Sequence, residues 1–138
     1  MYTITEMSIE DYEGAYRLWE ITPGMGLSSA DSRTAIASFL SRNEGLSYVC
    51  RQGEQVVGTV LCGHDGRRGF LYHVAVDQKH RGQALAGQLV ARSLSGLKEQ
   101  GIEKCHLMVI QDNEVGKHFW SKTGWQLRDQ ILFYSHHT

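Results

Sequence analysis

The sequence predicts one α/β domain of the mixed α+β kind, spanning residues 1–138, with a central mixed sheet flanked by helices. Its length of 138 residues suits a single domain with a sizeable core. Apolar residues alternate in some stretches and follow a helical period in others. Between residues 70 and 110, a strand-like run, a helical stretch and a second strand-like run succeed one another. This is the order of a βαβ unit, whose two strands are parallel. The expected order of elements is β-α-α-β-β-β-α-β-α-β-β.

The N-terminal half is expected to hold one strand, two helices and a hairpin. Ser8 and Asp11 have the spacing of a capping box and therefore indicate where the first helix begins. From residue 46 the apolar period changes from helical to alternating, with a tight turn at 52–54. In chain order, we expect a strand at 2–7, a helix at 9–21, a loop at 22–29, a helix at about 30–41, and strands at 46–51 and 55–62.

The C-terminal half is expected to hold the βαβ unit and the closing elements. Residues 70–76 form a nearly continuous apolar run, typical of a central strand covered on both faces. Gly101 lies where a helix C-cap glycine would lie. In chain order, we expect a strand at 70–76, a helix at about 83–100 with Ala86, Val90, Leu94 and Leu97 on its apolar stripe, a strand at 105–110, a helix from an Asn113 cap to about 123, and one or two strands within 125–135.

Composition excludes several classes of function. Fourteen Lys and Arg against fifteen Asp and Glu give a net charge of −1, without the basic surplus that nucleic-acid binding usually requires. No apolar run approaches the roughly 18 residues of a membrane span, and the N-terminus lacks a signal-peptide pattern. The three cysteines form no C-x-x-C pair, which favours a reducing compartment. We therefore expect a cytoplasmic protein with neither nucleic-acid nor membrane partners.

The turn after the run 70–76 is the best candidate for a ligand site. Ligands of open α/β sheets favour the carboxyl ends of strands, and a helix N-terminus there attracts phosphate. Neither a Rossmann fingerprint nor a P-loop is present, and a tight βα turn with a solvated basic loop would have the same composition. The turn combines the small residues Gly82, Ala84, Ala86 and Gly87 with the basic residues Lys79, His80 and Arg81.

Two segments resemble the GNAT N-acetyltransferases. Arg81-Gly-Gln-Ala-Leu-Ala86 looks like that family's acetyl-CoA signature, R/Q-x-x-G-x-G/A, and follows a strand that ends in Val74-Ala-Val76. Residues 113–125, NEVGKHFWSKTGW, are similar to the family's segment N-x-x-A-x-x-F-Y-x-x-x-G-F. With the expected pair of N-terminal helices, the resemblance covers essentially the whole chain.

The resemblance implies a GNAT-like sheet splayed between the strands at 70–76 and 105–110, with acetyl-CoA as co-substrate and no metal. The implied activity is direct transfer of the acetyl group to a primary amine of a small molecule or peptide within a ternary complex. A backbone N–H of the 74–76 stretch would meet the thioester carbonyl, and Asn113 would bond the pantetheine arm unless it serves only as an N-cap. The implied acetyl-CoA-binding residues are Val74, Ala75, Val76, Arg81, Gly82, Gln83, Ala84, Leu85, Ala86, Gly87, Asn113 and Trp120.

The sequence departs from the family pattern at two positions. Ala84 replaces a glycine, which is tolerated if its φ stays negative, because only a positive φ strongly requires glycine. Trp120 stands where many members have a tyrosine proposed to protonate the departing thiolate, and an indole cannot act as that acid. Because of these departures, a non-catalytic acyl-CoA-binding or regulatory module remains the alternative function.

His73 is the candidate general base, because neither strand of the βαβ unit carries an acidic residue. The alternative is a core histidine bonded to a backbone carbonyl, with Tyr72 pointing to the opposite face. His106 is expected to be structural. Cys62 and Cys105 are interpreted as buried hydrophobes, with a thiol nucleophile as the alternative.

The acceptor site is expected under the loop at 22–29. Trp19, Met25 and Leu27 either line a pocket there or pack the two helices together. No His or Cys spacing predicts a zinc site. The identity of the amine stays open, and a homodimer is among the assemblies that the sequence permits.

Overall fold

The computed structural model describes all 138 residues and divides into two compact units, Met1–Met108 and Val109–Thr138. The first unit holds, in chain order, β1 (Tyr2–Glu6), the 3-10 turn η1 (Ile9–Asp11), α1 (Tyr12–Glu20), the 3-10 turn η2 (Ser29–Asp31), α2 (Arg33–Arg42), β2 (Tyr48–Gln52), β3 (Gln55–His64), β4 (Gly69–Val76), the 3-10 turn η3 (Gln78–His80), α3 (Leu85–Glu99) and β5 (Cys105–Leu107).

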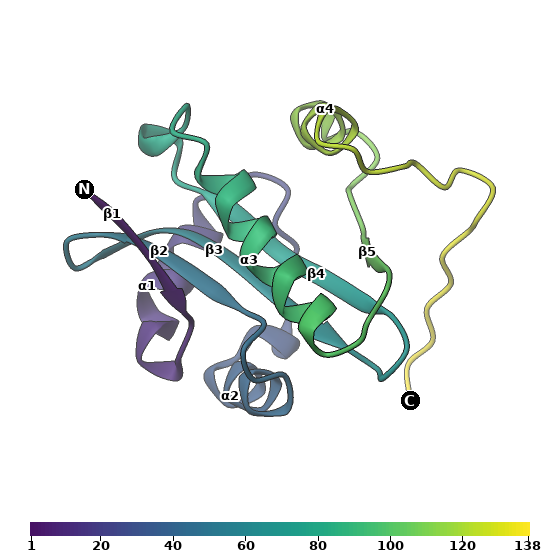
Figure 1. Cartoon of the computed structure of the whole chain (residues 1–138), viewed down its shortest axis with the longest axis horizontal. Helices are drawn as coiled ribbons and strands as arrows, with labels where there is room; N and C mark the ends of the chain where they lie inside the picture. The colour runs from purple at the N-terminus through teal and green to yellow at the C-terminus, as the bar shows by residue number, and fades with distance from the viewer. The chain divides into compact units, whose positions relative to one another are not determined.

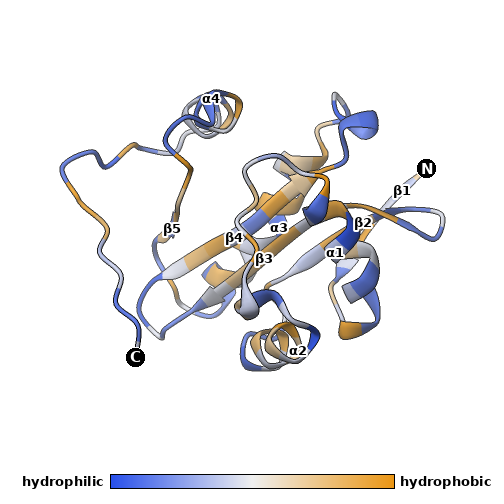
Figure 2. Cartoon of the chain, turned by 180° about the vertical axis from the view of Figure 1, so that it is seen from behind, coloured by the Kyte–Doolittle hydropathy of each residue, from blue (hydrophilic) through white to orange (hydrophobic).

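The sheet is mixed, as predicted. Its five strands follow the order β1-β2-β3-β4-β5, and all neighbours are antiparallel except β4 and β5, which are parallel across α3. Helix α3 covers one face of the sheet, and α1 and α2 cover the other (Figures 1 and 2). Strands β3 and β4 are largely hydrophobic, as expected of central strands between two helical layers (Figure 2).

The core on the α1 and α2 side is built around Trp19, which is fully buried. Leu18 of α1, Ile36 of α2, Leu61 of β3 and Ala75 of β4 belong to the same cluster. Met25 and Leu27, from the loop between the helices, pack against this cluster, so they help to join α1 and α2 as the structural alternative proposed. No helix of the structure has the length and apolar character needed to cross a membrane.

On the other face, α3 buries Val90 and Leu97 of the predicted stripe but not Leu94. Leu94 is exposed, whereas Ser93 is fully buried and its hydroxyl donates a 2.7 Å hydrogen bond to the carbonyl of Leu46. A polar residue can occupy the core position because its hydroxyl is satisfied there. Gly101 has a φ of 81° directly after the helix, which confirms the predicted C-cap.

The second unit contains one helix, α4 (Glu114–Lys122). The prediction of one or two strands within 125–135 is wrong for this structure, and β5 ends at Leu107 rather than at residue 110. After Trp125 the backbone forms a single backbone–backbone hydrogen bond, from Ile131 N to the carbonyl of Arg128. A strand exists only through hydrogen bonds to a partner strand. The apolar residues at 131–134 therefore match the composition of a strand without forming one.

Candidate active site

Strand β4 has a free edge over its C-terminal half. It pairs with β5 only at Gly69, Phe70 and Leu71, although it continues to Val76. From Tyr72 onward, the side of β4 that faces away from β3 has no strand partner. The backbone N–H and C=O groups on this edge are therefore open to a ligand, as expected for a sheet splayed between these two strands.

A β-bulge interrupts β4 at His73. Thr59 of β3 pairs with Ala75 and Leu61 pairs with Tyr72, so Val60 alone lies opposite two residues of β4. His73 takes a positive φ of 48°, unusual for a residue with a side chain. A positive φ costs conformational energy for a residue with a side chain. Such strained residues are common at β-bulges that change the direction of a side chain.

Because of the bulge, Tyr72 and His73 reach the same helical layer, and the prediction that they point to opposite faces is wrong. The Tyr72 ring packs edge-on against Phe39 of α2, with ring centroids 6.1 Å apart. The His73 ring packs against Trp19 of α1, with centroids 4.7 Å apart. Regular alternation would separate the two side chains, and the extra residue cancels that alternation.

The core-histidine alternative required a hydrogen bond between the His73 ring and a backbone carbonyl. The structure contains no such bond. The Nε2 atom of His73 lies 2.6 Å from carboxylate Oδ1 of Asp31, in a pair whose side chains are 14% and 9% exposed. Asp31 was not among the site residues predicted from the sequence. Its signal is Ser28 three residues earlier, because Ser28 and Asp31 form a second capping box like that of Ser8 and Asp11.

The turn after β4 is held by its own side chains. Asp77 begins η3 by accepting a 3.0 Å hydrogen bond from the backbone N–H of Lys79. The side chains of Lys79 and Arg81 are exposed, as a diphosphate cradle requires. His80 is not part of that cradle, because its Nδ1 atom lies 2.9 Å from the hydroxyl of Tyr2. Two of the three predicted basic side chains are thus exposed.

Residues 82–84 and Gly87 are exposed, whereas Leu85 is buried and Ala86 is half-buried. Gly82 has a φ of 84°, and Ala84, directly before α3, lies in the left-handed region with a φ of 60°. The condition under which alanine would be tolerated at position 84, a negative φ, is therefore not met. No side chain caps the first turn of α3. A Cβ atom added at Gly87 would meet nothing within 4 Å, so the packing of the chain does not require a glycine there.

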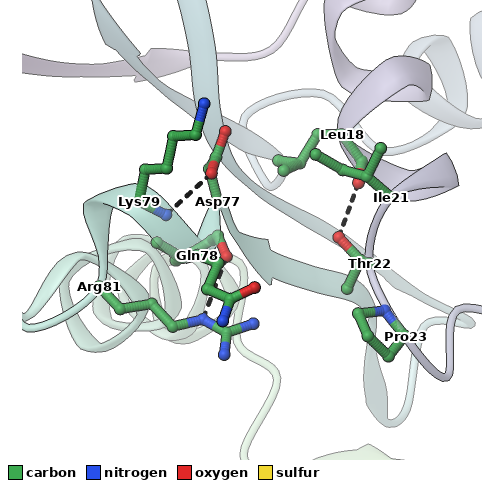
Figure 3. Close-up of a pocket in the computed structure, with 9 residues that line it drawn as sticks. Leu18, Ile21, Thr22, Pro23, Asp77, Gln78, Lys79 and Arg81 are labelled. Atoms are coloured by element: carbon green, nitrogen blue, oxygen red, sulfur yellow. Dashed lines mark hydrogen bonds between the residues drawn. The ribbon is translucent and has the colours of Figure 1, made fainter.

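A cavity of about 520 Å³ lies between this turn and the end of α1. Figure 3 shows Leu18, Ile21, Thr22 and Pro23 on one side of it, facing the turn on the other. Within the turn, Arg81 Nε donates a 3.4 Å hydrogen bond to the carbonyl of Val76. The cavity is lined by Leu18, Ile21, Thr22, Pro23, Val76, Asp77, Gln78, Lys79 and Arg81.

The second unit carries the two remaining predicted acetyl-CoA-binding residues. Asn113 is the N-cap of α4, and its side-chain oxygen accepts a 2.9 Å hydrogen bond from the N–H of Gly116. Trp120 packs edge-on against Phe119 and Trp125, with ring centroids 4.8 and 5.1 Å away. Asn113 therefore serves as an N-cap, which was the alternative to binding the pantetheine arm. The capping bond uses its side-chain oxygen and leaves the side-chain NH2 group out of that bond.

The cysteine thiols are poor nucleophiles in this fold. Burial raises the pKa of the Cys62 thiol to about 12 and that of the Cys105 thiol to about 11. Only a thiolate attacks efficiently, so neither residue favours a covalent mechanism. His106 packs against Phe70, with ring centroids 5.5 Å apart. No group of three or more His, Cys, Asp or Glu side chains is arranged to hold a metal ion.

Comparison with known proteins decides the family. The model described as "Acetyltransferase (GNAT) family" matches residues 9–125. The chain belongs to the GNAT acetyltransferase family. It is similar to an acetyltransferase of Photorhabdus laumondii, with 31% identity over 125 residues, 88% of this chain and 84% of that protein. The predicted GNAT resemblance is thus confirmed, and with it an enzyme that uses acetyl-CoA to acetylate amines.

Solved GNAT structures share the fold. The PaiA N-acetyltransferase of Thermoplasma acidophilum, solved in complex with coenzyme A, superposes with a TM-score of 0.79 at 19% identity, over 94% of this chain and 92% of that chain. An aminoglycoside N-acetyltransferase in complex with CoA gives a TM-score of 0.79 at 17% identity, over 100% of this chain and 96% of that one. At these identities, the likeness concerns the fold.

Proposed function

We propose that this protein transfers the acetyl group of acetyl-CoA directly to a primary amine of a small molecule or peptide, within a ternary complex. The observation that carries the proposal is the continuity of two open backbone segments, the free edge of β4 from His73 to Val76 and the uncapped start of α3. The first segment suits an extended pantetheine arm and a thioester carbonyl, and the second suits a diphosphate.

The residues of the turn fit the diphosphate of acetyl-CoA in three respects. The first N–H groups of α3 have no side-chain cap, and a helix N-terminus carries about half a positive charge. Lys79 and Arg81 add exposed cationic groups next to it. The empty space around the missing side chain of Gly87 allows close approach of the ligand to the backbone. We propose that residues 81–87 bind the diphosphate, and that the N–H groups of 74–76 bind the arm and the carbonyl.

His73 is the proposed general base. An amine with a pKa near 10.4 is almost entirely protonated at neutral pH, so a base must generate the nucleophile. Acetyl-CoA supplies an activated acyl group, and the protein supplies the base and the N–H groups that stabilise the developing oxyanion. In this chain no acidic residue lies on β4 or β5, whereas His73 lies at the bulge beside the free edge.

We also assign Asn113 and Trp120 to the acetyl-CoA site, on the family motif that contains both. The family match runs across both units of the chain, which supports one acetyltransferase domain over 1–138. The free cysteines Cys50, Cys62 and Cys105 favour the cytoplasm as its location. Trp120 offers no proton for the thiolate, so we propose that solvent protonates it.

The test is a CoA-release assay over amino acids, polyamines, aminoglycosides and peptides with free N-termini. We expect at least one class to be acetylated, and His73→Phe to lower kcat/KM about 100-fold or more and to remove the acid limb of its pH profile. A folded His73→Phe variant with unchanged kinetics would eliminate His73 as the base. Tight CoA binding without acetylation of any amine would favour the non-catalytic acyl-CoA-binding module, which the tryptophan at position 120 also favours.

A further inference from the structure

The pair formed by His73 and Asp31 joins two elements that are distant in sequence. Asp31 ends the 3-10 turn η2, and His73 lies at the bulge of β4. Their 2.6 Å contact involves Nε2 of the imidazole and Oδ1 of the carboxylate. Asp31 forms no ion pair with any lysine or arginine, and the imidazole of His73 is the one basic side chain within ion-pair distance of its carboxylate.

Two hydrogen bonds other than the contact with His73 hold Asp31 in place. Its second oxygen, Oδ2, accepts a 3.0 Å hydrogen bond from the backbone N–H of Ser28. Its backbone carbonyl accepts a 2.6 Å hydrogen bond from the hydroxyl of Tyr12. The group that contacts His73 is therefore fixed by contacts on both sides of it, as expected of a residue that orients another.

The contact determines which ring nitrogen of His73 is free. A carboxylate only accepts hydrogen bonds, so Nε2 must carry the proton in the neutral ring. Nδ1 has no hydrogen-bond partner, and every fully buried side-chain nitrogen or oxygen in the protein has one. Nδ1 is therefore accessible, and in the neutral ring it carries the free lone pair.

We propose that Asp31 is a positioning residue, which holds His73 through Nε2 so that Nδ1 takes the proton of the acceptor amine. This inference rests on the proposed function, since it assumes that His73 is the base. The protonated amine first passes one proton through Nδ1 to solvent, which leaves the neutral amine. Its nitrogen lone pair then forms the bond to the acetyl carbon, and Nδ1 takes the second N–H proton, which this bond displaces. The C–S bond breaks with its electron pair on sulfur, and solvent then protonates the thiolate and deprotonates the imidazolium. The Asp31 carboxylate stabilises the imidazolium between these steps.

Few other ionisable groups lie around the pair. Tyr12, bonded to Asp31, and Tyr16, which packs on Tyr12 and Trp19, approach from α1. Tyr72 is the neighbour on β4, while α2 and β3 present Phe39 and Thr59. Burial raises the pKa of both Tyr12 and Tyr72, so these phenols stay neutral around pH 7.

The test compares Asp31→Asn with a matched control, Asp11→Asn. Asparagine keeps one oxygen for the capping bond and replaces the charged second oxygen by an NH2 group, and Asp11 has the equivalent place in the first capping box. Asp11 pairs with Arg51 rather than with a histidine. We expect Asp31→Asn to lower kcat about 10- to 100-fold and to leave the KM for acetyl-CoA within about twofold. Asp31→Glu should recover part of kcat, and Asp11→Asn should keep wild-type kinetics.

A second readout does not depend on activity. Imidazole ¹⁵N NMR of the full chain, assigned with His73→Gln, should show the Nε2–H tautomer in the wild type and a mixture of tautomers in Asp31→Asn. An unchanged tautomer in folded Asp31→Asn, or equal losses of kcat in both asparagine variants, would overturn the role of Asp31. Full activity of His73→Gln, or no acetylation by the wild type, would refute the proposed function, while the NMR comparison still tests the positioning contact.

Discussion

Trp19 and Thr59 join helix α1 to the sheet at the point where β4 bulges. The indole Nε1 of Trp19 donates a 2.9 Å hydrogen bond to Oγ1 of Thr59, whose hydroxyl donates a 2.8 Å bond to the carbonyl of His73. Trp19 and Thr59 are both fully buried. One hydroxyl therefore satisfies a buried donor and a buried acceptor, and it ties the bulge to the layer that also carries Asp31.

Replacing the Thr59 hydroxyl by a methyl group should lower the free energy of unfolding more than removing the Thr59 methyl group does. Thr59→Val leaves the indole N–H and the His73 carbonyl without their partner, so we expect the free energy of unfolding to fall by about 2 kcal/mol or more. Thr59→Ser keeps the hydroxyl and loses one methyl group, at about 1 kcal/mol. Urea denaturation measures both values. If Thr59→Val were as stable as Thr59→Ser, the hydrogen-bond chain would have no energetic role.

Substitution by glycine should change the free energy of unfolding less at Ala84 than at Ala86. Ala84 has a φ of 60°, a conformation that costs an alanine about 1 kcal/mol and a glycine almost nothing. That relief roughly offsets the entropy gained by the unfolded chain, so Ala84→Gly should change the free energy of unfolding by less than about 0.5 kcal/mol. Ala86→Gly lies within the helix and should lose about 0.5–1 kcal/mol. Equal losses in urea denaturation would contradict the left-handed conformation of Ala84.

Gly87 should show opposite effects on stability and on substrate binding. Gly87→Ala adds a methyl group in open space on α3, so stability should rise by about 0.5 kcal/mol. The same methyl group should hinder the diphosphate and raise the KM for acetyl-CoA several-fold. Ser95→Ala, on an exposed position of the same helix, is the control that gains stability without a change in KM. A wild-type KM in Gly87→Ala would contradict the proposal that the first turn of α3 belongs to the acetyl-CoA site.

The buried thiol of Cys62 should make stability fall at alkaline pH. Burial raises the pKa of this thiol from 9.0 to about 12 in the folded protein, so the unfolded chain loses the proton first. The contribution of the thiol is complete below about pH 9 and decreases as the pH rises towards 12. Between about pH 8 and about pH 10 the free energy of unfolding should decrease by about 1.4 kcal/mol more in the wild type than in Cys62→Ala. Parallel curves for the two proteins would contradict this burial effect.

Local signals in the sequence were sufficient for much of the fold. The capping box of Ser8 and Asp11 and the glycine at position 101 predicted where helices begin and end, because both act within one turn of the chain. The stripe of α3 was predicted with Leu94 in place of Ser93 because the partner of Ser93, the carbonyl of Leu46, is distant in sequence. The strands expected within 125–135 depended on partners that periodicity cannot identify.

The candidate site likewise has parts that are local in sequence, which could be predicted, and parts that depend on distant residues, which could not. The turn from Arg81 to Gly87 is contiguous, so its composition was visible in the sequence. The pair of His73 and Asp31 was not, because it requires the bulge in β4 and the approach of a residue 42 positions away. The sequence left the φ of Ala84 open, since that angle depends on how the chain leaves η3 and enters α3.

The binding constant of CoA for the Arg81→Ala variant tests the central claim most directly, namely that the turn between β4 and α3 binds the diphosphate. Isothermal titration should give a Kd at least several-fold above that of the wild type, because an exposed guanidinium next to the helix N-terminus is lost. Arg67→Ala, which removes an exposed arginine from the turn between β3 and β4, should bind CoA as the wild type does. An Arg81→Ala variant with the wild-type Kd would contradict the account.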